Sequence, residues 1–140
     1  MNEQANKRLM RALEGTYIRE MSHDFLLENV FRYLKQVYVM VGFANPDRSD
    51  MILLGSKIAA DLMESYGFLT IEEVAYCFEM GAKGLLCDFN GINMRTVTRW
   101  LKYYKSSETR YQAIMALRAE RTRATLPPPS AAYKEEHERN

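Results

Sequence analysis

The strongest constraint on the fold is a wide stripe of apolar residues between positions 26 and 41. These residues recur every three or four positions, which places them on one side of an α-helix. They are Leu26, Leu27, Val30, Phe31, Tyr33, Leu34, Val37, Tyr38 and Val41. Because one packing partner covers only a narrower stripe, the sequence predicts a central helix over residues 22–41 that other helices cover on more than one side.

Helical spacing and helix-end signals continue along most of the chain, and no stretch alternates apolar and polar residues as a strand does. The expected helices cover residues 3–14, 22–41, 50–66, 71–80, 84–90, 94–105 and a last segment after Ser107. The expected N-caps are Ser22 or Asp24, Ser49 or Asp50, Thr70 in a capping box with Glu73, Asn93, and Ser106 or Ser107. We therefore predict an all-α fold, a compact bundle of about five to six helices.

The chain divides at a run of three prolines. Residues 1–125 fit a single helical domain, since domains commonly hold about 100–150 residues. Residues 126–140 contain Pro127-Pro128-Pro129 and the charged sequence SAAYKEEHERN, which predicts a mobile, disordered tail. No apolar run reaches transmembrane length, and MNEQANKRLMRALEG lacks an apolar signal core. We expect a soluble, cytoplasmic protein without membrane contact.

The charges are distributed unevenly. Although the net charge of the chain is only +1, residues 82–124 hold nine basic and three acidic residues, a net of +6. Residues 1–81 hold eight basic and twelve acidic residues, a net of −4. A basic segment of this kind predicts a surface that meets phosphates or an acidic partner, although solvated helix surfaces also carry charge runs.

Residues 84–105 contain the spacing of a helix-turn-helix. Gly91 can supply the left-handed residue of the turn, and the small residue Cys87 lies four positions before it. Apolar residues follow the glycine at positions that pack a second helix on the first: Ile92, Val97 and Trp100. The segment resembles the helix-turn-helix of small phage and mobile-element DNA-binding proteins, although Asn90 stands where such motifs usually carry an apolar residue.

The resemblance implies roles for the polar residues of the second helix. Val97, Trp100, Leu101 and Tyr104 share the face that would be buried. Arg95 and Arg99 could read guanine edges, and Thr98 a thymine methyl group or a phosphate. Lys102, Lys105 and Arg110 would contact phosphates. The expected DNA-binding set is Asn93, Arg95, Thr98, Arg99, Lys102, Lys105 and Arg110.

We find no pattern typical of an enzyme, metal site or cofactor site. The segment Gly81-Ala-Lys-Gly84 is too short for a phosphate loop, and neither GxSxG nor HExxH occurs. Cys77 and Cys87 lie among apolar residues without the CxxC or CxxH spacing of a zinc site, so we expect buried free thiols. The expectation is a protein without catalytic activity, cofactor or metal.

Two functions remain open from the sequence. One is a small helical protein that binds nucleic acid, in particular duplex DNA, as a regulator or replication accessory of phage or mobile-element type. The other is an interaction adaptor, a loader or inhibitor that docks on a larger protein machine. The aromatic-rich, acidic first half and the nine methionines favour this second function. The wide stripe of residues 22–41 also suggests a homodimer interface, and DNA-binding proteins of this size often act as dimers.

Overall fold

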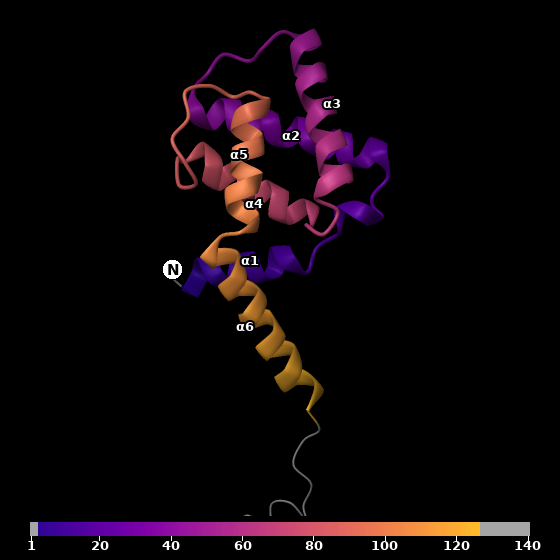
Figure 1. The fold of residues 1–140 in the computed structure, drawn as a ribbon, viewed down its shortest axis with the longest axis vertical. Helices are drawn as coiled ribbons and strands as arrows, with labels where there is room; N and C mark the ends of the chain where they lie inside the picture. The colour runs from indigo at the N-terminus through magenta and orange to yellow at the C-terminus, as the bar shows by residue number, and fades with distance from the viewer. Residues whose placement is uncertain (1–2, 127–140) are drawn as a thin grey trace, which may run out of the picture.

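Residues 3–126 are described by a computed structural model, and this part of the chain contains helices and loops but no strand (Figure 1). Its elements are α1 (Glu3–Leu13), the 3₁₀ helix η1 (Ile18–Glu20), α2 (His23–Val41), α3 (Arg48–Ser65), α4 (Ile71–Ala82), α5 (Met94–Lys105) and α6 (Glu108–Thr125). The predicted all-α fold is confirmed. The predicted tail lies, apart from Leu126, outside the described residues.

The helices run in two directions. In Figure 1, α1, α2 and α4 run across the long axis of the molecule, whereas α3, α5 and α6 run roughly along it. The helix α2 packs on α3 and α4, α5 packs on α4 and α3, and α6 packs on α1. The C-terminal half of α6 extends beyond the other helices, and its residues 121–126 are exposed. A single hydrophobic core joins these elements.

The helix α2 is covered on two sides, as its wide apolar stripe predicts. Leu26, Val30 and Leu34 are fully buried, and Tyr33 and Val37 are nearly so. One side of α2 meets α3 and the other meets α4, so the stripe is satisfied within a single chain. The width of the stripe therefore no longer argues for a dimer, and the dimer stays a prediction.

Most helix starts follow the predicted caps. Ser22, Thr70, Asn93 and Ser107 each accept a hydrogen bond from the backbone N–H three residues on. The prediction for α3 was wrong, since its cap is Asp47 and not Ser49 or Asp50. The Asp47 carboxylate accepts from the Asp50 N–H at 2.8 Å, so the helix begins at Arg48. This start is two residues earlier than a cap at Ser49 would give, and three earlier than a cap at Asp50.

The short helix predicted over residues 84–90 does not form. Gly84 takes a left-handed conformation (φ 76°), and the N–H groups of Gly84 and Leu85 donate to the carbonyls of Gly81 and Met80. This Schellman arrangement ends α4. Gly91, predicted as the left-handed turn residue, does not have positive φ. The tight helix-turn-helix over residues 84–105 is thus absent, and an irregular loop over residues 83–93 connects α4 to α5.

The loop is fixed to the core rather than free. The Tyr38 hydroxyl of α2 donates to the Ile92 carbonyl at 3.0 Å, and the Thr96 hydroxyl of α5 donates to the Gly91 carbonyl at 2.7 Å. The Phe89 ring meets the Trp100 indole edge-on, with ring centres 5.3 Å apart. These contacts hold the start of α5 in one position relative to α2 and α4.

The crossing of α5 over α4 depends on one small residue. Trp100 is fully buried, and a Cβ atom added to Gly81 would lie 2.2 Å from its indole. A rigid, enclosed ring cannot yield as a flexible side chain can. Gly81 thus fills the place of the small crossing residue that the sequence assigned to Cys87.

We expect Gly81→Ala to lower the free energy of unfolding by about 1–3 kcal/mol, because the added methyl overlaps the Trp100 ring. Gly91→Ala is the control, since the nearest atom to its added Cβ is the Asn93 side-chain nitrogen at 3.4 Å and its φ is not positive. Urea unfolding measures both. Equal stability of the two variants would contradict the close crossing.

Candidate nucleic-acid interface

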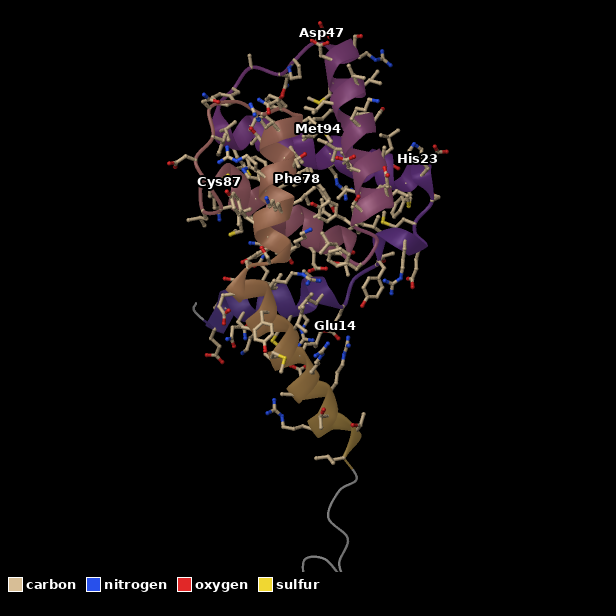
Figure 2. The ribbon with its side chains drawn as sticks, in the orientation of Figure 1. Glu14, His23, Asp47, Phe78, Cys87 and Met94 are labelled. Atoms are coloured by element: carbon tan, nitrogen blue, oxygen red, sulfur yellow. The ribbon has the colours of Figure 1, made fainter. Side chains whose placement is uncertain are left out.

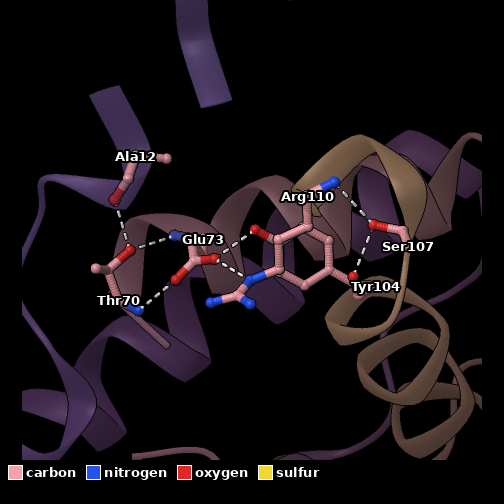
Figure 3. Close-up of polar contacts among 6 residues, drawn as sticks. All are labelled: Ala12, Thr70, Glu73, Tyr104, Ser107 and Arg110. Atoms are coloured by element: carbon pink, nitrogen blue, oxygen red, sulfur yellow. Dashed lines mark hydrogen bonds and ion pairs between the residues drawn. The ribbon is translucent and has the colours of Figure 1, made fainter. Parts of the chain in front are cut away.

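The buried carboxylate of Glu73 and its capping partner Thr70 connect α4 to α1, α5 and α6 (Figure 3). Glu73 of α4 is completely buried, and its Oε2 accepts from the Thr70 N–H at 2.8 Å in a capping box. Its Oε1 accepts from the Tyr104 hydroxyl of α5 and from Arg110 Nε of α6, both at 2.7 Å. The Thr70 hydroxyl donates to the Ala12 carbonyl of α1 at 2.6 Å.

The charges of this network balance. Glu73 and Arg110 form an ion pair, and the Arg110 side chain is only 14% exposed. Burial raises the pKa of the Tyr104 hydroxyl, and the neighbouring Glu73 charge raises it further, so the phenol keeps its proton and donates it to the carboxylate. All three groups facing the carboxylate are donors. The network therefore places α5 and α6 on α4 without leaving a buried charge unpaired.

Arg110 consequently has a structural position. The sequence placed it among residues that extend outward to phosphates, but its Nε is bound to Glu73 and its guanidinium lies 5.5 Å from the centre of the Phe68 ring. Because Arg110 is held in this way, we do not expect it to contact phosphates together with the exposed residues of α5. The capping box could be predicted from neighbouring residues, but the contacts of the second Glu73 oxygen could not, because its partners Tyr104 and Arg110 lie 31 and 37 positions further along the chain.

The face of α5 that points away from the core is basic and polar. The predicted buried residues Val97, Trp100, Leu101 and Tyr104 are all buried, and Thr96 joins them. The opposite face exposes Arg95, Thr98, Arg99, Lys102, Tyr103 and Lys105, which we call the α5 basic face. Met94, the first residue of α5, is labelled in Figure 2.

The four cations of the α5 basic face have no carboxylate partner within residues 3–126. No ion pair there includes Arg95, Arg99, Lys102 or Lys105, and α5 itself carries no acidic residue. Lys105 lies over the Tyr66 ring, with its nitrogen 5.5 Å from the ring centre. These four positive charges therefore face solvent without internal neutralisation.

The first turn of α5 adds to this positive potential. Each of the other five α-helices carries an acidic residue in its first turn, where the helix dipole is positive, but α5 carries none. Arg95 stands in that turn instead. Asn93 uses its side-chain oxygen to cap the helix, accepting from the Thr96 N–H at 3.0 Å. An anion near Arg95 would meet both a cation and the positive end of a helix.

A second surface feature is apolar and lies beside the start of α5. Cavities of about 520 and 400 Å³ share Pro46 as a lining residue and extend between α2 and α3 and toward Met94. Two large apolar side chains that line them, Ile52 and Leu53, are exposed. We call this region the Pro46 groove. Sequence reasoning missed it, because its residues come from three separate segments.

Neither a membrane helix nor a metal cluster is found in the described segment. No helix within residues 3–126 has both the length and the apolar character needed to cross a membrane. In the same residues, no three His, Cys, Asp or Glu side chains gather as metal ligands would. Cys77 is buried and Cys87 is partly buried, and both are free thiols. Burial raises the pKa of Cys77, which keeps it in the thiol form.

We expect Glu73→Gln to lower the free energy of unfolding by about 3 kcal/mol, because the amide NH₂ must face at least one donor and Arg110 loses its counter-ion. Glu72→Gln is the matched control. Glu72 is exposed and accepts only from the Thr16 N–H, which an amide oxygen can also do. We expect the control to cost less than about 1 kcal/mol in urea unfolding. Similar losses in both variants would contradict a special role for Glu73.

The chain was also compared with known proteins. Comparisons with protein-family models, with curated proteins and with solved structures found no match. The geometry and charge of the surfaces described above therefore carry what can be inferred about function.

Proposed function

We propose that this protein binds duplex DNA through the α5 basic face, as a small regulator or replication accessory of phage or mobile-element type. The observation that carries the proposal is the set of four exposed cations on one face of one helix, none of them paired with a carboxylate of residues 3–126. Lysine and arginine in such an arrangement release counterions from DNA when they bind its phosphates, which is the main source of affinity.

The arrangement of α5 also suits a helix that enters the major groove. An α-helix fits in a groove about 12 Å wide, and its N-terminal residues approach the base edges. In the proposed complex Arg95 and Arg99 contact guanine edges, and Thr98 contacts a thymine methyl group or a phosphate. Lys102 and Lys105, nearer the C-terminus of α5, contact phosphates.

The packing of α5 on the core supports this function. Its inner face is anchored by Trp100 against Gly81 and by Tyr104 on Glu73, so the helix itself needs no ordering when DNA binds. A rigid recognition helix loses little backbone entropy on binding, which raises the affinity of the complex.

The Pro46 groove favours a second candidate function, docking on another protein. Ile52 and Leu53 are 47% and 59% exposed there, although apolar patches of this kind are usually covered or functional. The partner in this case would present an apolar helix or loop to the groove. The two functions are compatible, since the groove and the α5 basic face meet at Asn93 and Met94 without sharing a cation of α5.

We expect the double variant Arg95→Gln, Arg99→Gln to bind a random-sequence duplex roughly 10- to 100-fold more weakly at about 0.1 M salt, because two phosphate-neutralising charges are lost. The control is Arg48→Gln, Lys57→Gln, which removes the same charge from the Pro46 groove and should retain most of the affinity. Fluorescence anisotropy measures both, with circular dichroism to check folding. Equal losses in the two variants would contradict a site on α5. Weak binding that is insensitive to salt would favour the docking function.

A further inference from the structure

A second cationic feature lies on α6. A cavity of about 220 Å³ opens between α6, the C-terminal end of α1 and the loop that precedes α4. Its polar lining comes from Tyr17, Glu73, Arg110, Arg118 and Arg121, and Phe68 and Leu13 contribute apolar walls. Glu14, labelled in Figure 2, directly follows the last residue of α1. We call this cavity the Arg118 pocket.

The charges around the Arg118 pocket do not balance. Glu73 and Arg110 neutralise each other, and the Glu73 side chain is only 1% exposed. Among residues 3–126, neither Arg118 nor Arg121 takes part in an ion pair. They are three residues apart on α6, where like charges repel. Two unpaired guanidinium groups therefore line one cavity.

Three carboxylates that neighbour pocket-lining residues in the sequence already have partners. Glu14 and Glu120 both bind Arg11, and Glu72 accepts from the Thr16 N–H. Among residues 3–126, none of these carboxylates pairs with Arg118 or Arg121, so both guanidinium groups stay available to an anion in the pocket. A bound anion would relieve the repulsion between Arg118 and Arg121.

We propose that the Arg118 pocket binds a phosphate group. Arginine matches phosphate geometry because its planar guanidinium donates two parallel hydrogen bonds, and the Tyr17 hydroxyl can supply a further donor. A volume of about 220 Å³ equals the share of roughly seven water molecules, which is room for a phosphate group and some water. The cavity is smaller than the roughly 300 Å³ at which sites for drug-sized ligands begin.

A series of aromatic contacts connects the pocket to Lys105 of the α5 basic face, which indicates one source for the phosphate. Lys105 lies over Tyr66, whose ring centre is 6.1 Å from that of Phe68, and Phe68 lines the pocket beneath Arg110. A nucleic-acid backbone on α5 could thus extend to the pocket. Free phosphate is the other source of the same chemistry. The binding of phosphate in the pocket does not depend on the proposed function of α5, but the backbone source does.

Inorganic phosphate is the first probe, titrated into ¹⁵N-labelled full-length protein and compared with chloride at equal ionic strength. We expect saturable amide shifts at Tyr17 and around Arg118, and at least a tenfold weaker affinity in the variant Arg118→Gln, Arg121→Gln. Arg123→Gln is the control, because Arg123 is exposed on α6 and does not line the pocket. Identical shifts with phosphate and chloride, or unchanged affinity in the double variant, would overturn the proposal.

A second measurement identifies the source of the phosphate. If the backbone of duplex DNA supplies it, the Arg118, Arg121 variant should lower the salt slope of DNA binding by about one to two units, since each phosphate contact adds about 0.9. An unchanged slope, together with phosphate binding to the normal protein, assigns the pocket to free phosphate. The variant Arg95→Gln, Arg99→Gln should still bind inorganic phosphate, so failure of the DNA proposal and failure of the pocket proposal give different results.

Discussion

The structure depends on one buried carboxylate. Glu73 caps its own helix with one oxygen and holds α5 and α6 with the other, while its capping partner Thr70 binds α1. A buried charge is costly unless it is paired and fully hydrogen-bonded, and Glu73 meets both conditions. The positions of α1, α5 and α6 are thereby set by groups that all meet at the first turn of α4.

This anchoring separates the two faces of α5. Tyr104 and Trp100 fix the inner face, and the outer face remains free to carry charges that no internal group neutralises. The same network removes Arg110 from solvent and leaves Arg118 and Arg121, two and three turns further along α6, as the cations of a separate pocket. One ion pair thus divides the basic segment of the chain into two surfaces.

Local signals in the sequence predicted much of this fold. The capping box of Thr70 and Glu73, the caps Asn93 and Ser107, and the two faces of α5 are properties of neighbouring residues, and all were confirmed. The helix predicted over residues 84–90 was wrong because Gly84 takes a left-handed conformation that ends α4, a choice that apolar spacing does not reveal. Asp47 likewise caps α3 in place of the predicted Ser49 or Asp50, although all three residue types are favourable N-caps.

The surfaces were harder to predict, because they join residues that are distant in the chain. The Arg118 pocket combines side chains from α1, α4, α6 and the loop at Phe68, and the Pro46 groove combines α2, α3 and the start of α5. The spacing of residues within one segment does not predict contacts between separate segments. The contact between Gly81 and Trp100 is of the same kind, although a glycine within a helical pattern is a hint of close packing.

The most direct test of the account is the affinity of the unmodified protein for random-sequence duplex DNA across a salt series. Each phosphate neutralised by the protein contributes about −0.9 to the slope of log K against log salt concentration. Four contacts from Arg95, Arg99, Lys102 and Lys105 predict a slope of about −3.6 or steeper. The absence of binding even at low salt, or a slope near zero, would contradict the assignment of α5 as a DNA-binding helix.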